Sequence, residues 1–498
     1  MISLNQARRF ISSCLIFFHA ESNMNANLNT PMRIVVAGAS GFVGMNLLRH
    51  LSSTCQIIAL TRSPLSSTSL PDHRLPGVYW LHCNLFSLKQ TEAALSECDI
   101  AYFLVHSMMP SARLTQGQYD DLDLIIADNF SRAGFSAGIK RIIYLGGIQP
   151  PSGFLSHHLR SRLEVEKTLL CRNKNSIALR AGLILGAGGS SSLILLRLVR
   201  RLPILLCPPW TSKLSSPISS EDCVAALVDC LDVNSIKPGS YDLEGPEALS
   251  YKELMMRAAA EMNVRRFFID IPAFSTELSR LWVSLITGFS RELVAPLVQS
   301  LQVEMLPGKC ADVFQQKQQK MPLILALHQA EMPRIKLEIK SATSAIPQVS
   351  QADSVVSIQR MPLPNNWTSV DVAREYTQWL PKILKPFIRI EISANGEFIH
   401  FKCIGIRQPL LELQFVESRS DAHRALLLVR GGLLRSSNSS QLSRLEFRII
   451  PEQNLVLAAV LDFTPALPWP IYLLTQAQAH RIIMMLFKKR MKKLSRIQ

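Results

Sequence analysis

The sequence lacks the residue groupings that mark a metal site or a disulfide framework. Its ten cysteines are scattered from Cys14 to Cys403, with no CxxC pair and no Cys/His cluster at metal-ligand spacing. Zinc sites need such spacings, and small disulfide-stapled domains need dense cysteine pairs. We therefore expect no bound metal, and free thiols in a reducing cytosol.

Motifs for nucleic-acid recognition are missing as well. Lysine and arginine number 54 against 38 acidic residues, a net charge of +16 that favours contact with polyanions. No helix-turn-helix spacing, zinc finger or aromatic strand motif accompanies these basic residues. The excess is also uneven, because residues 481–498 hold seven basic residues and no acid. We expect no nucleic-acid partner.

The chain has no long apolar run free of charges or prolines. The run LILLRLVRRLPILLCPP contains three arginines, which favours an amphipathic helix followed by an extended arm. In NLVLAAVLDFTPALPWPIYLL, Asp462 and three prolines disfavour a spanning helix. The N-terminal ARRFISSCLIFFHA has the shape of a signal peptide or weak anchor, or is an extension without structural role. We expect a cytoplasmic protein.

What the sequence does contain is a long alternation of short apolar runs with helical patterns, beginning at Arg33. This alternation predicts parallel strands joined by crossover helices. After a stretch rich in Ser, Ala, Gln and Pro, period-two runs such as RIEISANGEFIHFKCI predict an antiparallel sheet. The fold class is therefore α/β, a Rossmann-type doubly wound parallel sheet followed by an α+β domain. We expect an N-terminal extension over 1–31, the Rossmann domain with substrate-side helices over 32–330, a linker over 331–365 and the second domain over 366–498.

The segment GASGFVG is the strongest functional motif. It directly follows the apolar RIVVA and opens a helical pattern, the arrangement in which backbone N–H groups approach a pyrophosphate. The first glycine permits the tight turn, the second leaves room for phosphates, and the third lets the helix pack on the strand. We expect a nicotinamide cofactor to contact Gly38, Ser40, Gly41, Phe42, Val43 and Gly44.

The end of the second strand bears on the choice between NAD(H) and NADP(H). An NAD site places an acid there for the adenosine ribose, but this chain has Leu60, Thr61, Arg62 and Ser63. A guanidinium suits a 2'-phosphate, although Arg62 can equally be an ordinary solvated side chain. We expect NADP(H) rather than NAD(H).

On these motifs the chain resembles the atypical short-chain dehydrogenase/reductase superfamily, close to NmrA-like and complex I subunit-type NAD(P)-binding proteins. The resemblance rests on GASGFVG, AYFLVHSM, RIIYLGGI, HLRSRLEVE, LRAGLILG and GPEALSYKELM. Further motifs, RLEFRI and LPWPIYLLTQAQAH, are similar to proteins that fuse this domain to a DUF2867-type C-terminal region. The resemblance spans most of residues 33–487 and implies NAD(P)-dependent redox chemistry.

The proton-transferring pair usual in that superfamily, Tyr-x-x-x-Lys, is absent. None of the eight tyrosines has a lysine four residues later. Where the pair should stand, after RIIYLGGI, the chain has His158 and Arg162 at the same separation. Either His158 is a substitute acid/base beside Arg162, or the helix retains only cofactor contacts and His158 is solvated.

Three further residues are candidates for lining the cofactor. His106 and Ser107 follow the fourth predicted strand, at the edge where open parallel sheets bind ligands. The alternative is a polar strand end without function. Gly146 stands with Gly147 where the superfamily's usual serine would lie.

The C-terminal HRIIMMLFKKRMKKL combines apolar residues with a basic cluster. Such a helix either lies at a membrane surface or docks on the protein with a solvated basic end. Peripheral membrane contact is thus one of two expectations for this segment.

Two hypotheses of function follow. In the first, the protein is an NADP(H)-dependent oxidoreductase that holds a small, apolar carbonyl or quinone-like substrate between the Rossmann domain and the C-terminal domain. In the second, it is a non-catalytic NADP(H) sensor or assembly factor. The missing Tyr-x-x-x-Lys pair favours the second hypothesis, and the large apolar C-terminal domain favours the first.

Overall fold

A computed structural model gives the architecture of most of the chain. It describes residues 31–62, 75–106, 112–150, 155–272, 276–308, 320–331, 352–394, 396–437, 442–451 and 453–497. The N-terminal extension, Ser107 and most of the expected linker lie outside the described residues.

The first domain is built on a parallel sheet in the order β12-β7-β6-β4-β1-β2-β3. All its strand pairs are parallel, and the order reverses direction at β1, as in a doubly wound sheet. The prediction of a Rossmann-type sheet is therefore confirmed. The strands are β1 (Arg33–Ala37), β2 (Gln56–Thr61), β3 (Val78–His82), β4 (Ile100–Phe103), β6 (Arg141–Gly147), β7 (Ile177–Ala181) and β12 (Gly239–Asp242).

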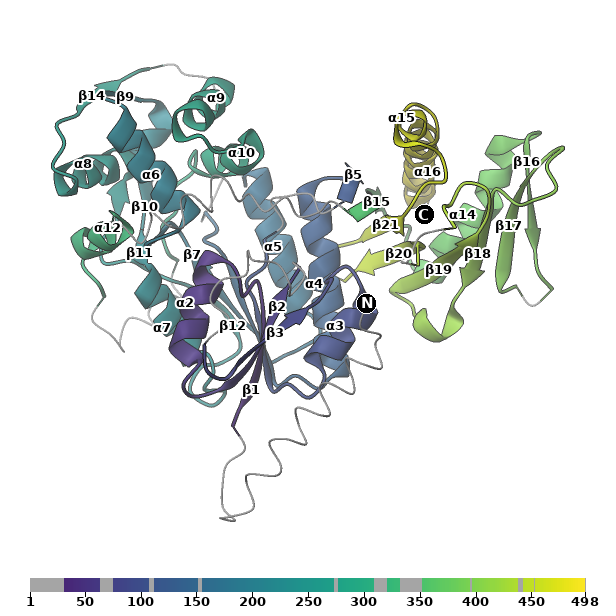
Figure 1. Cartoon of the computed structure of the whole chain (residues 1–498), viewed down its shortest axis with the longest axis horizontal. Coiled ribbons are helices and arrows are strands. Elements are labelled where there is room, and N and C mark those ends of the chain that lie inside the picture. Colours follow the sequence, from purple (N-terminus) through teal and green to yellow (C-terminus); the bar gives the residue numbers. More distant parts are fainter. Residues whose placement is uncertain are drawn as a thin grey trace, which may run out of the picture.

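Helices cover both faces of this sheet (Figure 1), which explains why its central strands are continuous apolar runs. One face carries α2 (Phe42–Leu51) and α7 (Ser220–Asp229). The other carries α3 (Leu88–Leu95), α4 (Tyr119–Ser136) and α5 (His157–Leu170).

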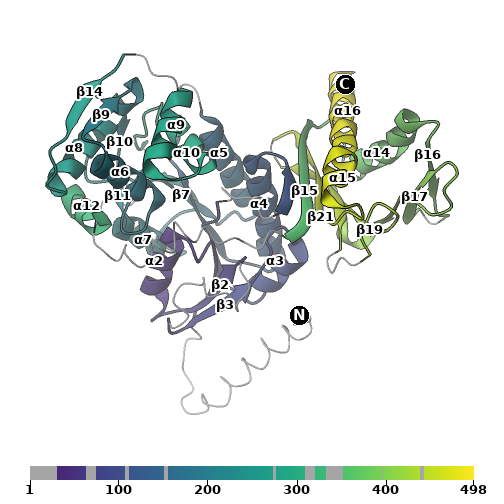
Figure 2. The same cartoon turned by 45° about the horizontal axis from the view of Figure 1, so that its top comes forward.

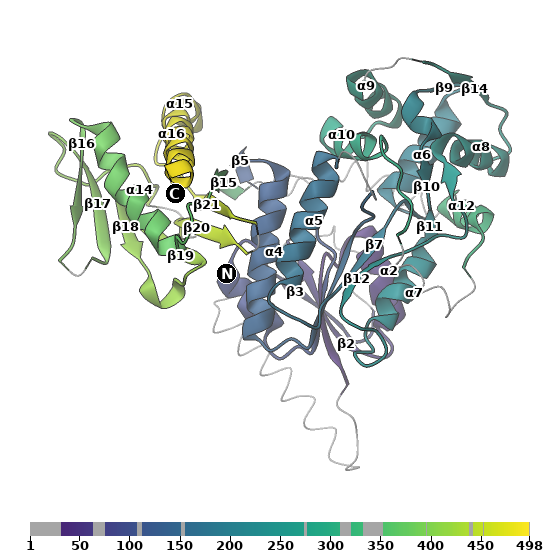
Figure 3. The same ribbon diagram turned by 180° about the vertical axis from the view of Figure 1, so that it is seen from behind.

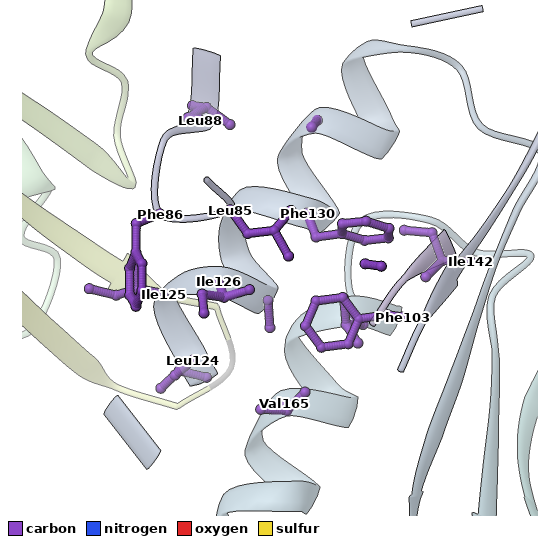
Figure 4. Close-up of a cluster of buried hydrophobic side chains, with 14 of the residues drawn as sticks. Leu85, Phe86, Leu88, Phe103, Leu124, Ile125, Ile126, Phe130, Ile142 and Val165 are labelled. Atoms are coloured by element: carbon purple, nitrogen blue, oxygen red, sulfur yellow. The ribbon is translucent and has the colours of Figure 1, made fainter. Parts of the chain in front are cut away.

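The core beneath α4 extends beyond the first domain. Phe103 of β4 meets Phe130 of α4 edge to face, with ring centroids 5.1 Å apart (Figure 4). The same continuous cluster includes Ile358 and Leu457 of the C-terminal sheet. The two domains thus share one hydrophobic core.

A helical lobe follows the sheet and lies over one end of it (Figure 2). The predicted amphipathic helix is α6 (Ser190–Arg201), and the extended arm after it is β9 (Ile204–Cys207), which pairs with β14 (Phe267–Asp270). The other helices of the lobe are α8 (Tyr251–Glu261), α9 (Thr276–Thr287), α10 (Arg291–Ser300) and α12 (Leu323–Glu331). Its short elements are β8 (Ile184–Leu185), η1 (Pro209–Ser212), β10 (Leu214–Ser215), β11 (Ile218–Ser219) and β13 (Leu249–Ser250).

The second sheet has eight strands in the order β16-β17-β18-β19-β20-β21-β15-β5. Its pairs are antiparallel except for β15 with β5, so the predicted antiparallel sheet is confirmed. The strands are β5 (Ala112–Gln116), β15 (Ala352–Pro362), β16 (Ile388–Ile392), β17 (Phe398–Cys403), β18 (Leu411–Phe415), β19 (Arg424–Gly431), β20 (Arg444–Ile450) and β21 (Leu455–Phe463).

Two of these strands depart from the expected domain division. Strand β15 occupies residues that were expected to form a linker. Its backbone N–H and C=O groups pair along β21, whereas those of a linker would be hydrogen-bonded to water. Strand β5 belongs by sequence to the Rossmann domain, yet it pairs with β15 at the edge of the second sheet. The division into two separate sequence blocks is therefore too simple.

Helices α14 (Ser369–Leu384) and α16 (Gln476–Ile497) cover one face of the second sheet, and the short α15 (Trp469–Leu474) precedes α16 (Figure 3). The C-terminal helix docks through Met484, Phe487 and Met491, which are buried. Lys488, Lys489 and Lys492 are exposed. Membrane contact through this basic side stays a prediction.

One buried and one partly exposed ion pair join the other face of the second sheet to α4 and α5. Arg448 Nη1 of β20 lies 2.8 Å from Asp128 Oδ2 of α4, and both side chains are fully buried. Arg360 of β15 reaches Glu164 of α5 with two hydrogen bonds of 2.8 Å. Such bidentate pairs fix orientation as well as distance.

Candidate functional site

The glycine-rich loop after β1 can be built only with glycine at two positions. Gly38 has φ +85°, and a Cβ there would lie 2.6 Å from the Leu104 carbonyl oxygen. A Cβ on Gly44 would lie 2.3 Å from the Gly38 oxygen. The first glycine therefore permits the turn from β1 into α2 to lie against the backbone that follows β4, and the third permits α2 to begin against that turn.

The N-terminus of α2, which directly follows this loop, has the features of an anion-binding site. Gly41 is the N-cap residue and contributes no side-chain cap, and the first turn of α2 contains no acid. The first N–H groups of a helix point outward and favour negative charge. Gly41 and Ser40 are exposed, and a Cβ on Gly41 would meet only the Gly38 oxygen, at 3.2 Å. The backbone there is open to a phosphate.

The loop opens into a cavity of about 460 Å³ at the point where the strand order reverses. Strands β1 and β4 are neighbours, so the segments that follow them lie at one edge of the sheet. Open parallel sheets bind ligands at this position. The predicted residues that line the cavity are Gly38, Gly41, Phe42, Val43, Gly44, His106, Gly146, His158 and Arg162.

Three predicted residues do not line it. Ser40 lies on the exposed turn outside the cavity. Arg62 directly follows β2, has an exposed side chain and lies within electrostatic range of Asp123. Ser107 is outside the described residues.

The far wall of the cavity comes from the lobe, and sequence reasoning missed it. Leu297, Ser300 and Leu301 come from α10 and its end, and Met305 follows them. Ser190 and Ser191 open α6, whose start is a second helix N-terminus in the same cavity. The only sequence signal was the amphipathic pattern of α6, which predicted a helix over the cleft without naming the residues that face inward.

The C-terminal domain does not enclose this cavity. Among the described residues, every lining residue lies between Gly38 and Met305. This cavity does not support the expectation that substrate sits between the Rossmann domain and the C-terminal domain, because the second sheet packs on α3, α4 and α5, to the side of the binding edge.

His106 is held by a carboxylate. Its Nδ1 lies 2.9 Å from Asp123 Oδ2 of α4, and the two side chains are 18% and 6% exposed. Its Nε2 is buried and has no hydrogen-bond partner among the described residues. Burial and Arg162 lower the pKa of His106, against the opposing effect of Asp123, so the imidazole is neutral at pH 7.

His158 lies beside His106, with ring centroids 5.0 Å apart. It is half-buried rather than solvated. Burial, followed by the nearby Arg162, His106 and His157, lowers the pKa of His158 to about 2. A neutral imidazole donates one hydrogen bond from its N–H group and accepts one at its other nitrogen, but it carries no extra proton to release as an acid.

Neighbouring side chains crowd Gly146 and Gly147 on β6, so a serine at either position would have to displace them. A Cβ on Gly146 would lie 2.8 Å from the ring of Tyr144. Tyr144 is fully buried, and its hydroxyl donates to the Arg162 carbonyl oxygen at 3.3 Å. Burial raises the pKa of Tyr144 to about 12, so this tyrosine is a packing residue rather than a proton donor.

The described residues contain neither a cluster of metal ligands nor a membrane-spanning helix. No group of three or more His, Cys, Asp or Glu side chains there is arranged to hold a metal ion. No helix in the described ranges is both long and apolar enough to cross a membrane.

Comparison with known proteins gives partial and distant likenesses. No protein-family model matches the chain. The chain is 31% identical over 115 residues to the auxiliary protein GraX of Staphylococcus aureus, which is 23% of this chain and 36% of GraX. The chain thus spans about a third of the length of the curated relative that it matches.

Solved structures similar to this chain include two of bacterial origin. A nucleoside-diphosphate-sugar epimerase from Staphylococcus aureus is 16% identical, with a TM-score of 0.48, over 60% of this chain and 100% of that one. The triphenylmethane reductase of Citrobacter sp., complexed with NADP(H), is 18% identical, with a TM-score of 0.48, over 60% of this chain and 99% of that one.

Proposed function

We propose that this protein is an NADP(H)-binding oxidoreductase of the short-chain dehydrogenase/reductase type, acting on a small apolar carbonyl or quinone-like substrate. The observation that carries the proposal is the glycine loop at residues 38–44, which opens at the sheet's switch point into a cavity. The same cavity holds two neutral histidines and Arg162.

The loop and the start of α2 would hold the cofactor's pyrophosphate. Three features support the fit: an uncapped helix N-terminus, no acid in its first turn, and an exposed Gly41. A nicotinamide in the cavity would supply or accept a hydride. Arg62, exposed at the end of β2 with no acid beside it in the chain, would contact the 2'-phosphate of NADP(H).

The substrate end of the cavity would lie among the apolar side chains of the lobe. Leu183, Leu297, Leu301 and Met305 line it. His158 and Arg162 are the only predicted catalytic residues, and both line the cavity on α5. We assign them to hold a carbonyl oxygen, with His158 as a neutral hydrogen-bond donor and Arg162 as a fixed cation.

A second candidate function is a non-catalytic NADP(H) sensor or assembly factor. The absence of any Tyr-x-x-x-Lys pair favours it, as does the low pKa of His158, which removes the substitute acid expected on α5. Under this alternative no carbonyl, quinone or enone oxidises bound NADPH above background.

Cofactor binding is tested by thermal unfolding of the whole chain with NADPH or NADH. A ligand that binds only the native state raises Tm with concentration, and NADPH should raise it more. Arg62→Ala should abolish that preference, whereas Arg49→Ala, an exposed arginine at the end of α2, should keep it. Equal shifts by both cofactors in the native protein would overturn the NADP(H) assignment, and no shift would overturn cofactor binding.

A further inference from the structure

His106 and Asp123 form a dyad that reaches the cavity from two different elements. His106 follows β4 and lines the cavity, and Asp123 lies in the first turns of α4. Their 2.9 Å contact places the imidazole between a buried carboxylate and the cavity. Proton transfer was expected from His158 on α5, and His106 with Asp123 is an alternative pair for it.

The contact with Asp123 decides which ring nitrogen carries the proton. An ionised carboxylate only accepts hydrogen bonds, so Nδ1 of His106 must donate to it. In the neutral ring Nε2 is then the unprotonated nitrogen. That atom is buried and without a hydrogen-bond partner among the described residues, which is costly unless a water or a ligand satisfies it.

Arg162 acts on both cavity histidines, but a carboxylate acts only on His106. His106 faces Asp123 from α4, Arg162 and His158 from α5, while Arg62 after β2 interacts with Asp123. The groups that shift His158 are Arg162, His106 and His157, which include no carboxylate. A proton arriving on His106 would be stabilised by Asp123, whereas none of the described groups that shift the pKa of His158 would stabilise a proton there.

We infer that Nε2 of His106 is the acceptor for a hydroxyl group of the substrate, so that the cavity takes ligands with an O–H group, the alcohol or quinol partners of the carbonyl class. This inference rests on the proposed function. Asp123 is a positioning residue that fixes the tautomer of His106, and His106 is the residue that contacts substrate.

An alcohol oxidised here would lose a proton and a hydride. The hydroxyl proton would pass to Nε2 of His106, and an oxidised nicotinamide held at the glycine loop would supply the acceptor for the hydride that leaves the carbinol carbon. The former O–H electron pair becomes the second bond of the carbonyl, and the imidazolium formed is paired with Asp123. Reduction of a carbonyl runs the same transfers in reverse.

The first test reads the tautomer without cofactor. Nitrogen NMR of histidine-labelled protein should show Nε2 of His106 unprotonated and Nδ1 protonated at pH 7. Asp123→Asn places amide donors where the carboxylate stood, which should move the proton to Nε2. A native protein with Nε2 protonated would overturn the inference.

The second test measures binding of 4-methylphenol against its methyl ether, which has the same ring but no O–H group. The native protein should prefer the phenol by about tenfold, the usual scale for one hydrogen bond to a buried group. His106→Leu should remove the preference. His157→Gln is the matched control, because His157 is exposed at the start of α5, lies 3.4 Å from Asp120 Oδ2 of α4 and does not line the cavity.

The outcomes separate this inference from the proposed function. A phenol preference that is lost in His106→Leu and kept in His157→Gln supports the acceptor role. No preference in the native protein, or one that survives His106→Leu, overturns it even if NADPH raises Tm. Conversely, if NADPH does not raise Tm but the phenol preference holds, only the proposal of a nicotinamide cofactor would be overturned.

Discussion

Arg448 and Asp128 form an ion pair between the two domains in which neither side chain has any exposed surface. Burial would raise the pKa of Asp128, but Arg132, Arg448 and Arg172 outweigh it and hold the pKa at about 2. A buried charge pair contributes little net stability by itself, yet removing one partner leaves the other charge uncompensated.

Asp128→Asn should therefore destabilise the protein by about 3–5 kcal/mol, because the buried Arg448 loses a counter-charge. Urea unfolding measures this loss. Glu391→Gln is the control, since Glu391 and Lys402 form an exposed pair on the second sheet, for which we expect at most about 1 kcal/mol. Equal effects of the two substitutions would contradict the importance of burial.

The buried histidines should make stability fall as the pH drops from 6.5 to 5. Burial lowers the pKa of His480 to about 4, and burial with Arg162 lowers that of His158 to about 2. Below the unfolded pKa of about 6.5 the unfolded chain binds protons that the folded chain does not, so stability is lost at up to about 1.4 kcal/mol per pH unit for each such histidine.

The buried carboxylate of Asp128 does not obscure this window. Asp128 has a depressed folded pKa, so its contribution is lost only as pH falls below its ordinary value near 4. His480→Gln should flatten the slope between pH 6.5 and 5, measured as urea midpoints, whereas His423→Gln, at an exposed position, should not. A slope unchanged in His480→Gln would show that His480 is not neutral in the folded state.

Gly41→Val should separate folding from cofactor binding. Gly41 has φ −77° and ψ 170°, which any residue adopts, and a Cβ there would have one contact, at 3.2 Å. The variant should unfold near the native Tm but lose its response to NADPH, because valine fills the space at the start of α2. Gly431→Ala, in open space on β19, should keep both. An undiminished NADPH response in Gly41→Val would show that the loop is not the site.

His158→Ala should distinguish orientation from acid catalysis. A general acid contributes about 10²-fold or more, whereas we expect a smaller loss from a neutral residue that only orients the substrate. Turnover of NADPH with a quinone panel gives the comparison, and the Tm response to NADPH should persist. A loss of about 10³-fold would restore His158 as the acid and contradict the neutral state described for it.

The sequence predicted the parts of the fold that depend on local patterns. The strand–loop–helix from β1 through α2 and the hairpin of β16 and β17 follow from periodicity and turn residues, and both are present. The glycine loop and His106 were found because their spacing to a strand end is short. The lobe residues Leu297, Ser300 and Met305 were missed because their place in the cavity depends on tertiary packing, for which one sequence has no periodic pattern.

Strand β5 was missed for a related reason. Its five residues, ARLTQ, are too short for a distinctive alternation, and its partner β15 lies about 240 residues later. The pairing of Ala112 with Ala352 depends on how the second sheet packs on α4, and no local sequence pattern predicts that packing.

That pairing also sets an order of events during synthesis. At the usual 5–20 residues per second, β5 leaves the ribosome about 12–50 s before its partner strand exists. Until β15 is made, the edge of β5 has no partner strand and the apolar side of α4 is not covered by the second sheet. Both surfaces would then be open to contact with other chains. Ribosome complexes halted before β15 is made should therefore bind chaperones. Complexes halted after β21 is made should bind fewer of them.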